Sequence, residues 1–362
     1  MDFFGIAKDT VDGFLKANVP MLNFIPDPDK VVKDPLGALG DQGNALLNFV
    51  VPAVPLGKAA LSAFSDEPNV EGAGGAPIIA AALATLRDML TQCGADRIPD
   101  EGAAFQAGAD AFRGITDGLS TMDAPDSWEG AAAEAYTFAN ELQRNRTRDM
   151  AELDRRIREA LNTEATDNMD TRSVLKDCAQ ELNAHIAPAL ALGAHPVAGD
   201  AASLSYQAHV VLRIMPRAIW RFQQLTGQAA AHAEEVHAAG SSYHPIRGEY
   251  DGRAQQSSGA GLRVSPEDVR TLSRQQQRAA TTIDSTKNLT VGVVANVKQT
   301  HGIVCEATGD ALATAVEARN ATIEWVSGES EQMSEGLAAA AEFYERVDEQ
   351  QGHQLDGEMP PR

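Results

Sequence analysis

The chain has 362 residues, of which 43% are hydrophobic and only 5% aromatic, and it carries a formal net charge of -21 at pH 7. This length is sufficient for two or three domains, each with a core of its own. The negative field repels phosphate backbones and anionic membrane surfaces, which argues against nucleic acid as a partner. Abundant alanine, with few apolar runs that alternate at period two, predicts an all-α fold.

Cysteine usage and the start of the chain narrow the cellular context. Cys93, Cys178 and Cys305 lie far apart without metal-ligand spacing, so they indicate neither a disulfide framework nor a zinc site. The start Met1-Asp2-Phe3-Phe4 lacks the basic segment of a cleavable Sec signal. The uncharged stretch 183–199 contains prolines and histidines and makes a poor membrane span. We therefore expect a chain that is soluble and carries no Sec signal.

The first 75 residues contain many prolines and glycines, which predict short helices and loops without an assigned role. A helical domain is expected over 76–238. Its first hairpin joins a helix near 101–122 to a second near 130–161, and two amphipathic helices with so short a connection pack antiparallel. Two further helical stretches over 171–238 are interrupted at 193–196 and kinked or stiffened at Pro216.

A glycine- and serine-rich segment, 239–262, predicts a flexible linker before a second helical hairpin at 263–349. Ser265-Pro266-Glu267-Asp268 is a strong helix start, with a hydroxyl at the N-cap and proline at the first helical position. The last helix keeps one apolar heptad register from Leu312 to Val347. The polar residues 350–362 predict a disordered tail.

Motifs for catalysis and cofactor binding do not emerge from the sequence. It contains no Gly-x-Ser-x-Gly, His-Glu-x-x-His or Walker pattern, and its glycine-rich stretches read as loops. His232 and His237 are five residues apart, which places them on different faces of a helix rather than in one metal site. We expect no enzyme, no catalytic residue, no cofactor and no metal.

Two short motifs mark the hairpins. Trp128-Glu129-Gly130 lies at the tip of the first hairpin, where the tryptophan either packs locally or forms a recognition feature. Tyr344 and Asp348 are one helical turn apart on the last helix, a spacing that suits a docking patch. With 51 acids in the chain, one such pair among five tyrosines arises by chance roughly half the time, and Tyr344 also fits the apolar seam.

Taken together, these features resemble substrates of the mycobacterial type VII (ESX) secretion system, with two families joined in one chain. The C-terminal hundred residues are similar to the EspC family in Leu262-Arg-Val-Ser-Pro-Glu267, in the turn Thr300-His301-Gly302-x-x-Cys305, and in Tyr344-x-x-x-Asp348. Residues 101–220 resemble the EspA/EspE family in Trp128-x-Gly130 with Ala132, Ala133 and Tyr136, in Leu153-Asp154-Arg155, and in Thr171-Arg172-x-Val174-Leu175.

The resemblance implies two antiparallel WXG-type hairpins that dock as a four-helix bundle, with Trp128, Gly130, Tyr344 and Asp348 as a composite secretion signal. It also implies recognition by a type VII secretion ATPase and a dedicated chaperone, contact with other helical type VII substrates, and self-association as a further possibility. The chain would be made in the cytoplasm and exported to the cell surface or beyond, as a structural or virulence-associated protein. A cytoplasmic scaffold or chaperone for such substrates is the alternative.

Two further expectations concern the membrane and the turn cysteine. Arg213 and Arg217 interrupt the apolar segment that corresponds to a more membrane-like one in EspA/EspE proteins, which argues against membrane contact. Cys305 follows a predicted turn and is expected to be exposed. It could then pair with another copy in an oxidising compartment.

Overall fold

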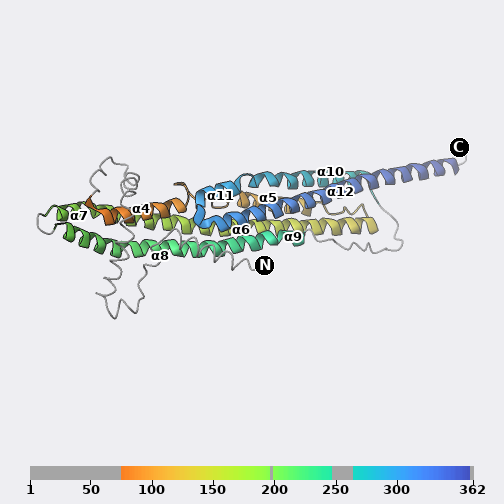
Figure 1. Cartoon of the computed structure of the whole chain (residues 1–362). Helices are drawn as coiled ribbons and strands as arrows, with labels where there is room; N and C mark the ends of the chain where they lie inside the picture. The colour runs from red at the N-terminus through yellow and green to blue at the C-terminus, as the bar shows by residue number, and fades with distance from the viewer. Residues whose placement is uncertain (1–74, 196–198, 247–263, 359–362) are drawn as a thin grey trace, which may run out of the picture. The chain divides into compact units, whose positions relative to one another are not determined.

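The computed structural model describes residues 75–195, 199–246 and 264–358, and over these ranges the secondary structure is helical without a strand (Figure 1). The all-α prediction is confirmed. The chain forms two compact units: residues up to 93 with 169–226 make the first, and 94–168 with 227–362 make the second. The expected elements in 1–74, most of the linker and the end of the tail lie outside the described residues.

In the first unit, helix α4 (Pro77–Gln92) buries Ile79, Leu83 and Leu86. Its N-cap, Ala76, has no side-chain acceptor, and Gln207 supplies one instead because its Oε1 accepts from the Ile78 amide at 3.0 Å. At the other end of α4, Arg172 donates to the carbonyl oxygen of Cys93. Long-range side chains therefore satisfy backbone groups that a helix end leaves open.

The second unit contains α5 (Ala103–Ser120), α9 (Tyr243–Ile246), α10 (Pro266–Ser285), η3 (Thr286–Thr290), α11 (Val293–His301), η4 (Ile303–Cys305) and α12 (Glu306–Glu358). Two long helices, α6 (Ala131–Ala184) and α8 (Gly199–Ser241), contribute segments to both units. The short helix α7 (Ile186–Gly193) connects them along the chain and belongs to the first unit. The Ser265 side chain accepts from the Asp268 amide at the start of α10, as predicted.

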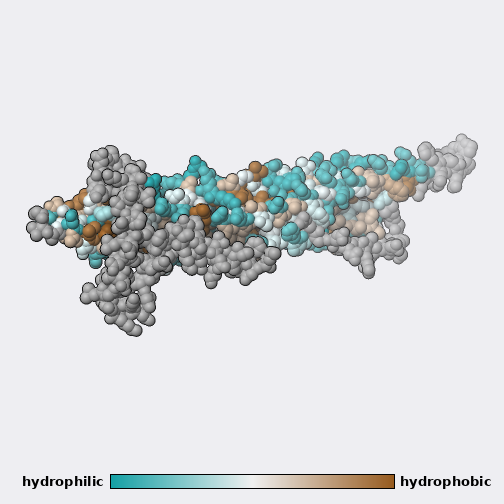
Figure 2. All heavy atoms as spheres, in the orientation of Figure 1, coloured by the Kyte–Doolittle hydropathy of each residue, from teal (hydrophilic) through white to brown (hydrophobic). Residues whose placement is uncertain are grey.

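The C-terminal hairpin brings α10 and α12 side by side (Figure 1). Ser273 and Ser334 each donate a hydroxyl hydrogen bond to the other's backbone carbonyl at 2.9 Å, and Ser327 does the same to Ala280 at 3.0 Å. These small side chains let the two backbones approach closely. The heptad positions of α12 from Leu312 to Val347 are all buried or half-buried, which agrees with the predicted seam. On the face shown in Figure 2, the surface over α10 and α12 is largely hydrophilic.

The core of the second unit combines residues from seven helices. α5 contributes Phe105, Phe112 and Leu119, and these pack with apolar residues of α6, α8, α9, α10, α11 and α12. A charged pair also lies inside this core: Arg319 donates to both carboxylate oxygens of Asp154, and neither side chain is exposed.

Three predicted boundaries are wrong. The second helix was expected to end near 161, but α6 continues to Ala184 because no glycine or proline interrupts it. The start of the expected linker is helical, since α8 reaches Ser241 and α9 buries Tyr243 and Ile246. The tail was expected to be disordered from 350, but α12 reaches Glu358, two residues before Pro360.

Candidate functional site

Trp128 lies in the connection between α5 and α6, where its side chain is only 4% exposed. Its amide donates to the Pro125 carbonyl at 2.8 Å, which folds the connection into a turn. Gly130 then enters α6 with a φ of +108°, a conformation that an L side chain rarely adopts. The tryptophan therefore packs inward at the hairpin tip, as the packing interpretation of this residue requires.

The partners of Trp128 come from both hairpins. Its ring lies 5.6 Å from that of Tyr136, measured between centroids. The two rings belong to a small apolar cluster, which we call the tip cluster and which comprises Trp128, Ala133, Tyr136, Val269, Leu272, Leu337 and Ala341. The tip of the first hairpin is therefore held between the start of α10 and a late segment of α12.

Polar contacts fix the tip cluster in place. The Tyr136 hydroxyl donates to the Met122 carbonyl at 2.6 Å, and Asn140 donates to the Leu119 carbonyl at 3.0 Å, so two side chains of α6 satisfy the end of α5. Gln276 of α10 donates to the Tyr136 hydroxyl at 3.3 Å and to Asn140 at 3.2 Å. Burial raises the pKa of Tyr136 to about 12, although the hydrogen bond from Gln276 opposes the rise.

Tyr344 and Asp348 have different environments. Tyr344 follows Ala341 of the tip cluster by three residues on α12 and is 9% exposed, whereas Asp348 is exposed. Between them, Glu345 forms an ion pair with Arg270 of α10, and this hydrogen bond lowers the pKa of the Glu345 carboxyl. Tyr344 therefore lies one helical turn after Ala341, a member of the apolar cluster that also contains Trp128, while Asp348 is at the surface.

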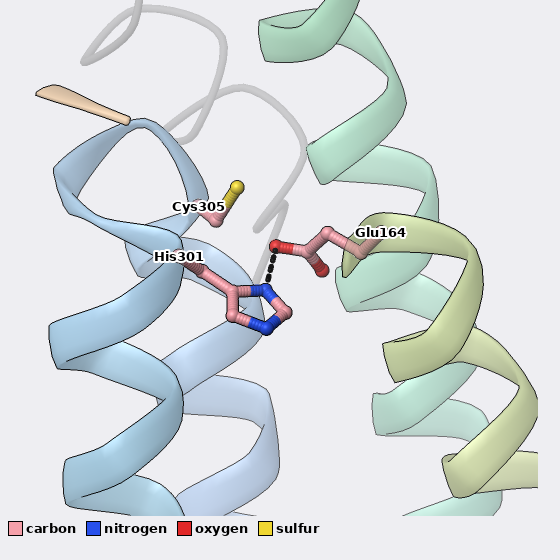
Figure 3. Close-up of side chains that lie close together, drawn as sticks. All are labelled: Glu164, His301 and Cys305. Carbon is pink, nitrogen blue, oxygen red and sulfur yellow. Dashed lines mark ion pairs between the residues drawn. The ribbon is translucent and has the colours of Figure 1, made fainter. Parts of the chain in front are cut away.

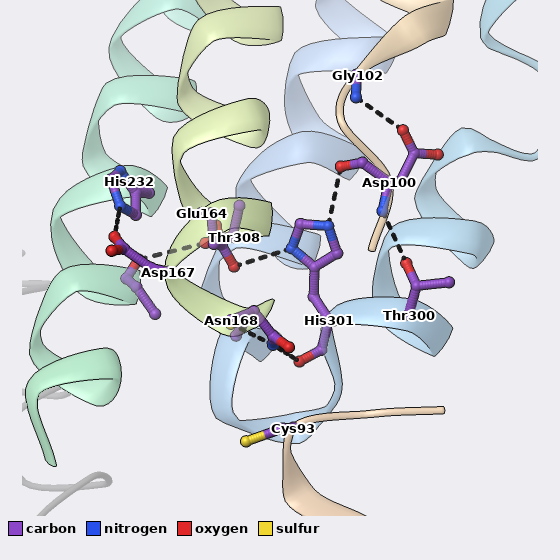
Figure 4. Close-up of polar contacts among 12 residues, drawn as sticks. Cys93, Asp100, Gly102, Glu164, Asp167, Asn168, His232, Thr300, His301 and Thr308 are labelled. Atoms are coloured by element: carbon purple, nitrogen blue, oxygen red, sulfur yellow. Dashed lines mark hydrogen bonds and ion pairs between the residues drawn. The ribbon is translucent and has the colours of Figure 1, made fainter. Parts of the chain in front are cut away.

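The turn motif Thr300-His301-Gly302-x-x-Cys305 binds the segment that precedes α5 (Figure 4). The Asp100 amide donates to the Thr300 hydroxyl at 3.2 Å, and His301 Nε2 donates to the Asp100 carbonyl at 3.0 Å. Gly302 ends α11 with a φ of +78°. The motif therefore joins the C-terminal hairpin to the segment before α5, because it provides hydrogen-bond partners for both the amide and the carbonyl of Asp100.

Cys305 is 2% exposed, and its Sγ lies 4.0 Å from Asn168 Nδ2. The expectation that it would be exposed is wrong, because η4 folds back against α6 rather than toward solvent. Cys93 and Cys178 are buried as well.

One cluster of potential metal ligands was missed by sequence reasoning. Glu164, His301 and Cys305 are all buried, and their ligand atoms lie within 4.8 Å of one another (Figure 3). His301 and Cys305 are four residues apart around a glycine turn, which was the available signal. Glu164 comes from a distant helix and has no sequence relation to them. By contrast, His232 pairs with Asp167 at 3.2 Å, and His237 is exposed, so these two histidines do not share a site.

Two stretches of the chain match protein-family models. Residues 259–357 match "Excreted virulence factor EspC, type VII ESX diderm", and residues 93–177 match the EspA/EspE family. The resemblance to type VII secretion-associated proteins that was inferred from the sequence is therefore confirmed, with an EspA/EspE-like stretch and an EspC-like stretch in one chain. Neither family description names an enzymatic activity.

Individual relatives show the same similarity. The chain is 27% identical over 175 residues to the ESX-1 secretion-associated protein EspE of Mycolicibacterium smegmatis, covering 48% of this chain and 33% of the relative. It is 35% identical over 79 residues to EspE of Mycobacterium tuberculosis H37Rv, and this match covers 22% of this chain and 20% of the relative. It is 28% identical over 111 residues to EspA of the same strain, and this match covers 31% of this chain and 28% of the relative. The chain thus spans a third or less of each relative. No solved structure gives a significant match.

Proposed function

We propose that this chain is a type VII secretion substrate that is exported in a folded, helical state and acts as a structural or virulence-associated interaction protein at or beyond the cell envelope. The observation that carries the proposal is the tip cluster, in which an EspA/EspE-type hairpin turn and an EspC-type hairpin pack together in one chain. No described helix combines the length and apolar character needed to cross a membrane.

In the composite secretion signal, the buried residues would have a packing role and the exposed residue a recognition role. Trp128 and Tyr344 are almost fully buried, so their role would be to hold the two hairpins together at this end of the unit. Asp348 is exposed on the same helix and would be read directly, by a type VII secretion ATPase or by a dedicated chaperone. Covalent linkage of the two hairpins raises their effective concentration, which favours docking before export.

The test separates recognition from folding. Asp348→Ala removes an exposed carboxylate, and Glu349→Ala removes the next one as a matched control. In a mycobacterium with an active type VII system, we expect Asp348→Ala to be lost from the culture filtrate while Glu349→Ala and the unaltered chain are exported. All three should accumulate equally in cells and unfold at the same temperature.

Two results would count against the proposal. Normal export of Asp348→Ala would remove Asp348 from the signal. Retention of the unaltered chain in the cytosol, under conditions in which other type VII substrates are secreted, would favour a cytoplasmic scaffold or chaperone.

A further inference from the structure

Glu164 of α6 is a fully buried carboxylate that lacks the donors such a group requires. Its exposure is 0%, and neither of its oxygens accepts a hydrogen bond from any residue that the structure describes. The Nδ1 atom of His301, a side chain that is also completely buried, lies 3.3 Å from Glu164 Oε1. A buried carboxylate is costly unless it is paired or bound to a cation, so this position requires a positive charge.

The orientation of His301 is fixed from its other side. Nε2 lies 3.0 Å from the Asp100 carbonyl oxygen, which can only accept, so Nε2 carries a proton. In the neutral ring, Nδ1 then presents a lone pair toward Glu164 (Figure 3). Metal-bound histidines typically have this arrangement, with one nitrogen held by a backbone carbonyl and the other directed at the ion.

The third group, Cys305, brings a sulfur atom to the same place. Its Sγ lies within 4.8 Å of the ligand atoms of Glu164 and His301. Asn168, one turn after Glu164 on α6, donates to the His301 carbonyl at 2.8 Å and so holds the turn that carries both ligands (Figure 4). The two ends of the cluster are therefore positioned by α6 and by the turn before α12.

We propose that Glu164, His301 and Cys305 bind one divalent transition-metal ion, with Zn²⁺ as the best match, and that this ion links α6 to the turn between α11 and α12. A carboxylate, a neutral imidazole and a thiolate carry two negative charges, which balance a divalent cation. Thiolate and imidazole favour zinc over magnesium or calcium. Bonds of about 2.0–2.3 Å place tetrahedral ligands roughly 3.3–3.8 Å apart, a spacing that the cluster reaches with small side-chain shifts.

Cobalt(II) provides a direct probe, because a thiolate-bound tetrahedral cobalt ion gives a charge-transfer band in the near ultraviolet and intense visible bands. The tag-free full chain would be refolded under reducing conditions with Co²⁺, so that burial does not block loading. We expect one cobalt per chain with both signals, displacement of the signals by Zn²⁺, and a higher midpoint of thermal unfolding with Zn²⁺ than with a chelator.

Variants assign the ligands. Cys305→Ser should abolish the charge-transfer band, and Glu164→Gln should weaken cobalt binding at least tenfold. Cys178→Ser removes a buried cysteine outside the cluster and should leave both signals unchanged. Circular dichroism at each titration point establishes that the chain is folded.

A folded, unaltered chain without cobalt bands would overturn the proposal and leave Glu164 and His301 as a metal-free ion pair. A charge-transfer band that survives in Cys305→Ser would overturn the assignment of its thiolate. Neither result depends on secretion, so the metal site and the proposed export function can fail separately.

Discussion

Arg319 and Asp154 form a bidentate ion pair inside the second unit, with Nε to Oδ1 at 2.8 Å and the second nitrogen to Oδ2 at 2.9 Å. Tyr243 donates to the same carboxylate. Burial raises the pKa of Asp154, while Arg319 and Tyr243 oppose that rise. Each partner therefore offsets the desolvation cost of the other, and α6 is tied to α12 through the core.

Removal of one partner should destabilise the chain more than removal of both. Arg319→Met leaves a buried carboxylate without its counter-charge, and we expect a loss of about 3–5 kcal/mol in the free energy of unfolding. The double variant with Asp154→Leu should lose less stability than either single variant, and therefore less than their sum. Urea unfolding and a double-mutant cycle measure the coupling.

Arg155→Met is the matched control for this cycle. Arg155 pairs with Glu152 and Glu159 at the surface, so its replacement should leave stability nearly unchanged. Additive losses in the Asp154–Arg319 cycle would contradict the coupling.

The tip cluster should make stability fall at alkaline pH. Burial holds the pKa of Tyr136 at about 12 in the folded chain, whereas an unfolded tyrosine ionises near pH 10. The folded state therefore keeps a proton that the unfolded state releases, and this contribution is present below about pH 10 and lost as pH rises toward 12.

Tyr136→Phe should lower stability by about 1 kcal/mol at neutral pH, because the hydrogen bond to Met122 is lost. The stability of this variant should also fall less steeply with pH than that of the unaltered chain between about pH 10 and 12. Urea unfolding of both proteins across this range measures the difference in slope. Parallel pH curves would exclude Tyr136 as the group responsible.

Gly302 should not tolerate a side chain. Its φ of +78° and ψ of -177° lie in a region that is nearly restricted to glycine, so we expect Gly302→Ala to cost about 1–3 kcal/mol. Gly328→Ala is the control, because a Cβ there meets open space within helix α12, and alanine should stabilise by about 0.5–1 kcal/mol. Thermal unfolding shows whether each variant is less or more stable than the unaltered chain. Equal effects of the two substitutions would contradict the conformational requirement for glycine at position 302.

The thiols of the folded chain should be unreactive. Cys93, Cys178 and Cys305 are all buried, and burial raises the pKa of Cys93 to about 12 despite the nearby Arg172. We expect no disulfide-linked dimer on a nonreducing gel after native oxidation. A thiol reagent should modify all three cysteines only after unfolding in urea, so rapid modification of the native chain would contradict this prediction.

Much of the fold follows from local sequence. The positions Phe105, Phe112 and Leu119 are buried as their helical spacing predicts, and Ser265 caps α10. The family turn and the hairpin motifs were also recognisable, because each is defined by neighbours a few residues apart. Helix ends were predicted less well where no breaker marked them, as at Ala184, and where buried side chains continued a helix into the linker.

The sequence by itself determined the all-α class, the helix starts and the resemblance to two families, because periodicity, caps and motifs act over one or two helical turns. Only the tertiary structure decided that Trp128 and Ala341 share one apolar cluster, that Cys305 is buried, and that Glu164 faces His301. These relationships join residues more than a hundred positions apart. They depend on how helices dock, which no local spacing specifies.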